Sequence, residues 1–450
     1  MKDCAKAASQ SNLVDRIISA LPLQDRAFLL DSPPGCAHNR NLPYSWADGE
    51  MLFGWEPAQV LQADVAQGCN DALRSLDRLW QSSGEARSAI AVGYFSYDMG
   101  GCIEPVAASA LPNDPFPLMY FAFYDRYFAY NPVSGRLRLH QRGHVEDVDV
   151  SSFQELGVSI PAGRRTSSVK RPTAQANFTM QGYVRAVEAA REYILAGDIY
   201  EVNLSQRVTV PYDGCPGELY LRLRTGNPAP YSAFLSVPGG TILSSSPELF
   251  LGVEGDHVVT RPIKGTIRRH ADPGADEAAA RALAASVKDN AELAMIVDLE
   301  RNDLGRVCRY GSVKVLEACR VETFSRVHHL VSTIEGRLSP DSTLSPLIAA
   351  TFPGGSITGA PKIRAMQIID ELEPCRRGLY TGAIGCVLPG RRAQFNIAIR
   401  TFLHHGSRLL LQVGGAVTAD SDPEAEYQET LAKADAMLAA VGATFPDRET

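Results

Sequence analysis

The order of strand-like and helix-like segments limits the possible folds most strongly. Short apolar runs bounded by Gly and Pro, as at 89–97 and 118–130, predict β-strands in the first part of the chain. Later, strand-like blocks at 241–266 and 381–415 are separated by a long Ala- and Leu-rich helical stretch at 276–305. The block at 381–415 predicts three strands, with turns at Pro389-Gly390 and His405-Gly406. Because strands and helices do not alternate regularly, the pattern favours an α+β fold over a regular βαβ winding.

A polar stretch divides the sequence. Residues 161–179, "PAGRRTSSVKRPTAQANFT", contain two prolines and show no apolar periodicity. A chain of 450 residues exceeds what one hydrophobic core usually serves. We therefore predict two domains, at 12–160 and at 178–440, with the first rich in sheet.

Composition excludes several classes of function. The net charge of −7 provides no basic surface for nucleic acid or for an anionic membrane. No apolar run reaches the length of a signal-peptide core or a membrane span. The nine cysteines are scattered and never spaced as CxxC, which argues against a disulfide framework or a zinc cluster. These features predict a cytoplasmic protein.

Two pairs of acidic residues have i, i+3 spacing on predicted helices, which places both carboxylates of a pair on one helix face. Either these side chains are solvated and complement the helix dipole, or the two helices face each other and hold a hard cation. One Glu from each helix suffices for magnesium, which keeps several waters. The pairs are Asp289 with Glu292 and Glu426 with Glu429, the latter on a helix that Asp422 and Pro423 are predicted to start.

Other segments suit an anionic ligand. The Gly-rich turn at 352–361 enters an apolar-periodic helix, where free N–H groups attract anions unless they form a plain cap. Gly414 and Gly415 end a strand and permit close backbone approach, or form a tight turn. Arg400, in the predicted strand "AQFNIAIRT", has a guanidinium that suits clamping a carboxylate or forming a surface ion pair. Together with Lys264, these features predict a pocket for a small, multiply anionic substrate.

Nine motifs occur in order between about 180 and 440. They are "GDIYEVNLSQR", "SSSPELF", "RPIKGT", "DNAELAMIVDLERNDLGR", "VHHLVSTIEG", "FPGGSITGAPK", "YTGAIG", "FNIAIRT" and "EYQETLAKA". Through these motifs the chain resembles the chorismate-utilising enzymes. This resemblance implies a fold like that of anthranilate synthase component I, with large β-sheets packed in a sandwich and flanking helices, and a catalytic domain that binds chorismate.

Lys264 distinguishes branches of this family. Anthranilate synthases typically have "PIAGT", whereas "PIKGT" is similar to aminodeoxychorismate synthase component I. That resemblance implies amination of chorismate to 4-amino-4-deoxychorismate for p-aminobenzoate and folate synthesis. Glu201 departs from the glutamine common in ammonia-using members; its carboxylate either raises the pKa of a neighbour or pairs with a cation. The alternatives are anthranilate synthase component I and an inactive, amino-acid-binding regulatory subunit.

The resemblance implies a covalent mechanism for Lys264. Its amine attacks C2 of chorismate and expels the C4 hydroxyl, and ammonia then adds at C4 and releases the lysine. Since a free lysine is protonated at neutral pH, we expect burial or a neighbouring cation to lower its pKa. Arg261 and Arg268 are the nearest cations in the sequence.

The resemblance also assigns the remaining roles. The general acid for the departing hydroxyl is Glu248, and its pKa must be raised for this task near neutral pH. Ammonia is expected from a separate glutamine amidotransferase subunit. The direct Mg²⁺ ligands are Glu292 and Glu429, with Asp289 and Glu426 orienting its waters; the ring carboxylate lies by His329, Ser356 and Thr358; the enolpyruvyl carboxylate is received by Tyr380, Arg400 and the N–H groups of Gly414 and Gly415; and a tryptophan pocket includes Ser32, Asn227, Pro228 and Tyr231.

Overall fold

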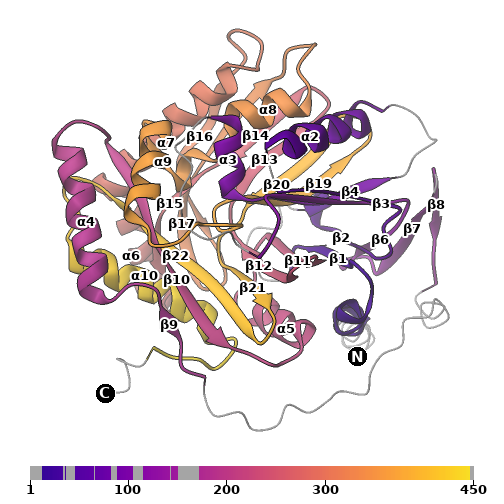
Figure 1. Ribbon diagram of the computed structural model, residues 1–450, viewed down its shortest axis with the longest axis horizontal. Coiled ribbons are helices and arrows are strands. Elements are labelled where there is room, and N and C mark those ends of the chain that lie inside the picture. Colours follow the sequence, from indigo (N-terminus) through magenta and orange to yellow (C-terminus); the bar gives the residue numbers. More distant parts are fainter. Residues whose placement is uncertain are drawn as a thin grey trace.

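The computed structural model describes residues 13–33, 36, 46–64, 66–82, 89–104, 115–141, 143–149 and 172–445. Most of the predicted domain boundary, 161–171 of 161–179, lies outside these residues. Within the described chain, two large sheets with antiparallel pairing are covered by helices (Figure 1). The predicted α+β class is confirmed.

The larger sheet has 12 strands in the described chain. Its strands, in order across the sheet, are β18 (Gly359–Ala360), β10 (Glu201–Pro211), β22 (Arg408–Val417), β21 (Thr401–His405), β12 (Gly240–Ser246), β11 (Tyr231–Val237), β1 (Phe28–Asp31), β2 (Met51–Gly54), β6 (Arg126–Asn131), β7 (Arg136–Gln141) and β8 (His144–Asp147), with β9 (Gln175–Ala176) beside β10.

The second sheet has 10 strands in the same described ranges. Its order is β15 (Ile263–Arg268), β17 (Val327–Arg337), β14 (His257–Arg261), β13 (Leu249–Glu254), β20 (Arg392–Ile397), β19 (Ala383–Leu388), β4 (Ile90–Phe95), β5 (Met119–Tyr124) and β3 (Gln59–Ala63), with β16 (Lys314–Thr323) beside β17.

Strands from both parts of the sequence contribute to each sheet. In the larger sheet β1 pairs with β11, and in the second sheet β4 pairs with β19. The segments predicted as domains, 12–160 and 178–440, therefore share both sheets, and their strands are joined edge to edge. Figure 1 shows the N-terminal strands β6, β7 and β8 at one edge of the molecule and helices α4 and α10 at the opposite edge.

Helices cover the sheets. Helices α4 and α10 pack against each other beside β10 and β22, and α7 packs on β15 and β17. The helices are α2 (Ala66–Gln81), α3 (Gly100–Ile103), α4 (Met180–Leu195), α5 (Pro216–Gly226), α6 (Pro273–Ala284), α7 (Val287–Gly305), α8 (Leu344–Thr351), α9 (Lys362–Leu372) and α10 (Pro423–Leu438), with 3₁₀ turns η1 (Leu21–Leu23), η2 (Trp46–Gly49), η3 (Tyr97–Met99) and η5 (Gly355–Ile357).

Local signals explain where several of these elements begin and end. Helix α10 starts as predicted, because Asp422 accepts a hydrogen bond from the Ala425 N–H at 2.8 Å and Pro423 occupies the first turn. The stretch predicted as helical, 276–305, is helical over most of its length and ends at Gly305. It is divided between α6 and α7, because the Ser286 hydroxyl caps a new helix by accepting from the Asp289 N–H.

The block 381–415 has four strands rather than the predicted three. The turns after Leu388 and after His405 occur as predicted, but β20 ends at Ile397 and β21 begins at Thr401. Arg400, predicted to lie within a strand, adopts a positive φ of 50° between these two strands. This left-handed conformation breaks the extended chain and redirects the arginine.

Candidate active site

Lys264 lies in β15 at an irregularity of the strand. The register with β17 shifts between Lys264 and Thr266, and Gly265 between them has a φ of 68°. Such a bulge with a left-handed glycine re-aims the adjacent side chain. The Lys264 side chain is consequently buried, with 7% of its surface exposed, although it stands in a short, partly exposed strand.

Lys264 forms an ion pair with Glu201 at the start of β10. The Lys264 Nζ is 2.5 Å from the Glu201 Oε1, and the glutamate is fully buried. Burial alone would lower the pKa of Lys264, but the carboxylate of Glu201, with Glu292 and Glu248 further away, raises it above its usual value. The expectation of an uncharged resting amine is therefore wrong. Glu201 both pairs with a cation and raises the pKa of a neighbour, the two alternatives considered for it from the sequence.

The two arginines near Lys264 in the sequence do not act on it. Arg261 forms a buried ion pair with Glu322, and Arg268 is exposed at the end of β15. Neither arginine is among the main causes of the pKa shift of Lys264, which is upward.

Glu248 follows β12 and lies in the same interior region. Its Oε1 accepts a hydrogen bond from the Ser356 hydroxyl at 2.5 Å and approaches the Ile263 N–H at 3.4 Å. Burial raises the pKa of Glu248 to about 7, and the hydrogen bonds and Lys264 only partly oppose this shift. The carboxyl group is thus protonated in part near neutral pH, as a general acid requires.

Arg400 and His329 lie side by side. The Arg400 Nη2 is 3.5 Å from the His329 Nε2, and the His329 Nδ1 is 2.8 Å from the Thr266 hydroxyl. Burial, assisted by Arg400, lowers the pKa of His329 well below its usual value, so the ring is neutral. A neutral imidazole beside a guanidinium leaves this arginine's charge available to an anion.

Ser356 and Thr358, grouped with His329 in the prediction, have different surroundings. The Ser356 hydroxyl donates to Glu248. The Thr358 hydroxyl is fully buried and donates to the Gly354 carbonyl at 3.0 Å. This hydrogen bond stabilises the Gly-rich turn locally. Their contact with a substrate carboxylate stays a prediction.

Tyr380 lies against Gly414. A Cβ on Gly414 would be 3.0 Å from the Tyr380 Oη, so the glycine provides the space for this hydroxyl. The Arg377 guanidinium lies 5.7 Å from the centre of the Tyr380 ring. These contacts bring together two residues predicted to receive the enolpyruvyl carboxylate.

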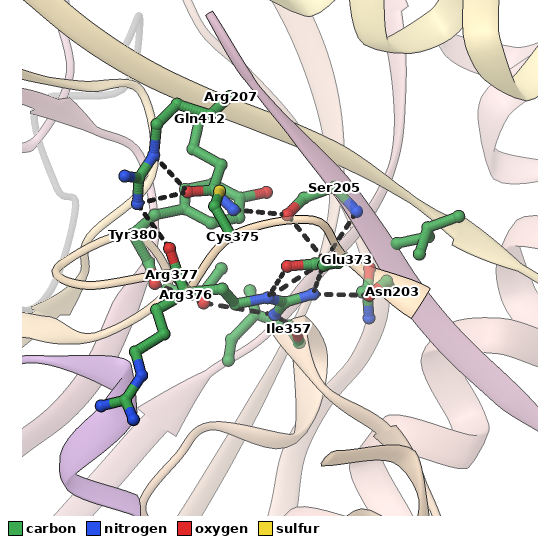
Figure 2. A network of polar contacts seen from close by, with 12 residues as sticks. Asn203, Ser205, Arg207, Ile357, Glu373, Cys375, Arg376, Arg377, Tyr380 and Gln412 are labelled. Atoms are coloured by element: carbon green, nitrogen blue, oxygen red, sulfur yellow. Dashed lines mark hydrogen bonds and ion pairs between the residues drawn. The ribbon is translucent and has the colours of Figure 1, made fainter. Parts of the chain in front are cut away.

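A buried polar network anchors the loop before Tyr380 (Figure 2). The Arg377 Nη2 donates to Glu373 at 2.8 Å and to the Asn203 carbonyl at 2.6 Å, and Glu373 accepts from both the N–H and the hydroxyl of Ser205. Because Asn203 and Ser205 belong to β10, this network ties the loop to the strand that carries Glu201. The sequence prediction missed it, although the i, i+4 spacing of Glu373 and Arg377 was a signal.

The predicted metal carboxylates converge from α7 and α10. A Cβ on Gly415 would be 3.0 Å from the Glu426 Oε2 and 3.7 Å from the Glu429 Oε1, so both glutamates approach the backbone of β22. Lys288 on α7 is 3.8 Å from the Glu292 Oε1 and acts electrostatically on Glu429 of α10. The two helix faces are therefore directed toward one another.

The residues fit a magnesium ion. The Glu292 Oε1 and the Glu426 Oε2 are buried without a hydrogen-bond partner in the described structure. Buried polar atoms normally have a partner, and a bound cation would provide one for these oxygens. Among the described residues no three His, Cys, Asp or Glu side chains form a complete ligand cage. Mg²⁺ does not require such a cage, because it takes one or two protein carboxylates and completes its shell with water and substrate oxygens.

The protonation of these glutamates differs. Burial raises the pKa of Glu292 to about 7 and that of Glu426 above its usual value. Glu429 is half-exposed and bonded to Lys433 at 2.7 Å. Burial favours its neutral form, but Lys433 and other lysines lower its pKa overall. Lys264 and Lys288 oppose the upward shift at Glu292 only in part, so an incoming cation would supply further positive charge there.

The residues of the predicted tryptophan pocket are partly brought together. The Ser32 hydroxyl donates to the Pro230 carbonyl at 2.6 Å. The Tyr231 ring packs edge-on against the buried Trp46 ring, with 5.8 Å between the ring centres. Asn227, next to the half-buried Pro228, instead donates to the Ala436 carbonyl at 2.7 Å. Residues 37–45 and 34–35, around Ser32, lie outside the described chain. Tryptophan binding stays a prediction.

Comparison with known proteins identifies the class. The model of the chorismate binding enzyme family matches residues 26–439, and the chain belongs to this family. It is therefore a chorismate-utilising enzyme, as the ordered motifs predicted. No helix of the described ranges is long and apolar enough to cross a membrane.

Relatives of two activities are equally similar. The chain is 42% identical over 368 residues to anthranilate synthase component 1 1 of Haloarcula marismortui, which covers 78% of this chain and 75% of that protein. It is also 42% identical over 359 residues to aminodeoxychorismate synthase component 1 of Bacillus subtilis, over 78% and 76% of the two chains. The predicted resemblance is thus confirmed.

A solved structure confirms the predicted fold. Anthranilate synthase component I from Streptococcus pneumoniae superposes with a TM-score of 0.74 at 30% identity, over 88% of this chain and 93% of the other. The expectation of an anthranilate synthase component I-like fold, made from the motifs, is correct.

Proposed function

We propose that this chain is an aminodeoxychorismate synthase component that converts chorismate and ammonia to 4-amino-4-deoxychorismate, for p-aminobenzoate and folate synthesis. The observation that carries the proposal is a buried lysine, Lys264, held at 2.5 Å from Glu201 with Glu248 and Glu292 around it. Anthranilate synthases typically have alanine at this position, so a nucleophilic amine distinguishes the two activities here.

The reaction has two halves. The Lys264 amine forms a bond to C2 of chorismate while the C4–O bond breaks, and Glu248 donates the proton that releases the hydroxyl as water. Ammonia then bonds to C4, and the C2–N bond breaks to free the lysine. Mg²⁺, held by Glu292 and Glu429, supplies a Lewis acid for the substrate's carboxylate oxygens.

Different residues of the site bind different groups of the substrate. Arg400, with neutral His329 beside it, offers a guanidinium to a carboxylate, and Tyr380 offers a hydroxyl near Gly414. The buried network of Glu373 and Arg377 holds the Tyr380 loop in place. These side chains bind and orient, and burial of the region excludes water from the adduct.

The name of the bacterial relative, "component 1", supports a partner subunit. We propose a separate glutamine amidotransferase that delivers ammonia, and a cytoplasmic heterodimer. Bound tryptophan near Ser32 belongs to the same proposal. Isothermal calorimetry with tryptophan tests it, and an absence of binding heat would remove it.

Product analysis tests the proposed activity. Purified protein with chorismate, ammonium and Mg²⁺ is expected to yield 4-amino-4-deoxychorismate without pyruvate. Pyruvate with fluorescent ortho-aminobenzoate would instead identify an anthranilate synthase. Chorismate binding without turnover, with or without Mg²⁺, would identify a regulatory subunit that has retained the fold.

A further inference from the structure

We propose that Glu201 is a catalytic residue, the base that takes the proton from the Lys264 ammonium as this amine attacks the substrate. The same carboxylate returns the proton when the amine leaves. The inference rests on the proposed function, since it concerns the activation of the lysine nucleophile.

The pair bridges the two sheets. Glu201 is the first residue of β10 in the larger sheet, and Lys264 is in β15 of the second sheet. Both side chains are buried and their charged atoms are 2.5 Å apart. The two groups are therefore in direct contact through a charge-assisted hydrogen bond, along which a proton can move without an intervening water. Both strands are anchored in sheets, so the geometry is fixed before substrate binds.

The carboxylate of Glu201 lacks the partners of a structural ion pair. Its Oε2 is buried with no hydrogen-bond partner in the described residues, and the amide of Asn203 approaches Oε1 only at 3.5 Å. Buried structural carboxylates normally have their oxygens satisfied. For comparison, Glu373 accepts from Ser205 as well as from Arg377. The Lys264 ammonium is therefore the main support for the Glu201 charge.

The surrounding charges make an internal base necessary. Glu248, Glu292 and Glu429 all act electrostatically on Lys264, and with Glu201 they favour its ammonium form. A protonated amine has no lone pair with which to attack. Glu248 is bonded to Ser356 and is assigned as the acid, while Glu292 and Glu429 are assigned to the metal. Glu201, in direct contact with the ammonium, is the remaining base.

Charge balance favours this transfer. If the lysine lost its proton elsewhere, Glu201 would remain as a buried, unpaired anion, which is strongly unfavourable. Transfer within the pair replaces two buried charges by two neutral groups. Exclusion of water by a bound substrate makes the neutral pair more favourable, because desolvation penalises the charged forms.

Atoms and protons balance over the cycle. Lys264 gives one proton to Glu201, its neutral amine bonds to C2, and the C4 hydroxyl leaves as water with a proton from Glu248. Ammonia then bonds to C4 and becomes the product's ammonium. The C2–N bond breaks with its electrons on the lysine nitrogen, and Glu201 returns its proton to that amine. Glu248 regains a proton from solvent.

The test follows adduct formation in a single turnover. Full-length protein is mixed with chorismate and Mg²⁺ without ammonia. Mass spectrometry then measures, over time and at several pH values near neutrality, the fraction of the protein that carries the mass increment of the adduct. Glu201→Gln keeps the side-chain size and an oxygen acceptor but cannot hold the proton. We expect its adduct rate to fall by about 10²-fold or more. Relative to the native rate at the same pH, the variant rate should rise with pH, because the proton must leave to solvent. The native rate itself should follow the protonation of Glu248, whose pKa is about 7, and fall above that pH.

Two further variants control for structure. Asp31→Asn neutralises another buried carboxylate, 2.6 Å from Arg224 and outside the proposed site, and should leave the adduct rate and its pH profile unchanged. Glu201→Asp keeps a carboxylate at a longer distance and should be slower than the native protein, with the same pH profile as the native protein. It replaces Glu201→Gln should the latter not fold.

The outcomes separate the two proposals. A Glu201→Gln protein that forms adduct at the native rate or faster, or slowly but with the pH profile of the native protein, overturns the role of Glu201 while leaving the amination intact. A fall in the adduct rate of Asp31→Asn as large as that of Glu201→Gln also overturns the role of Glu201. A native protein that forms neither adduct nor aminated product overturns the proposed function, and this inference with it.

Discussion

The carboxyl group of Asp289, in the first turn of α7, lies against the backbone of Gly265 in β15. A Cβ on Gly265 would be 2.9 Å from the Asp289 carboxyl carbon, closer than side chains tolerate. Gly265 follows Lys264, and Glu292 is one turn beyond Asp289. This contact therefore sets how closely the lysine strand approaches the helix that carries the proposed metal ligand.

Replacing Gly265 by alanine is expected to displace Lys264. Both Gly265 and Gly255 have positive φ, 68° and 64°, but Gly255 has open space around its Cβ position. Gly255→Ala should thus lose only about 1–2 kcal/mol from backbone strain. Gly265→Ala should lose about 1–3 kcal/mol more in urea denaturation and about 10²-fold in turnover, because small displacements of reacting groups are costly. Equal stability and activity of the two variants would refute this account.

Glu248 should make stability depend on pH. Its folded-state pKa is raised from 4.5 to about 7. Between these values the unfolded chain releases the proton while the folded chain keeps it, so stability is fully present below pH 4.5 and declines as pH rises to about 7. Glu248→Gln does not titrate and should reduce this decline by about 3 kcal/mol. Denaturant midpoints at acidic and alkaline pH measure it, and a decline as large in the variant would contradict the assignment.

Magnesium should stabilise the native protein through Glu292 and Glu429. With chorismate present and Mg²⁺ at about ten times its dissociation constant, the gain should be about 1.4 kcal/mol. Glu292→Gln and Glu429→Gln should lose most of this gain in thermal denaturation. Glu424→Gln, an exposed residue at the start of the same helix α10, is the control and should retain it. An equal magnesium effect in all four proteins would exclude these ligands.

Local patterns predicted the elements better than their interruptions. Asp422 and Pro423 indicated the start of α10, because a helix cap depends on residues that are adjacent in the sequence. The break between β20 and β21 was missed because no Gly or Pro stands at 398–400. Arg400 has a positive φ there, and a residue that rarely takes this conformation gives no local signal of it.

The site was predictable in its residues but not in its cross-sheet contacts. The spacing of Asp289 with Glu292 and of Glu426 with Glu429 indicated paired carboxylates, and the helices do converge. The contact of Lys264 with Glu201 joins strands of different sheets, so no local periodicity reports it. The predicted direction of the lysine's pKa shift was wrong for this reason.

The central claim is that Lys264 forms a covalent bond to chorismate. Intact-protein mass spectrometry after incubation with chorismate and Mg²⁺, without ammonia, tests it most directly. The account predicts a mass increment equal to chorismate less one water, which maps to Lys264 after proteolysis, is absent in Lys264→Ala, and disappears when ammonium is added. An unmodified native protein that still aminates chorismate would contradict it.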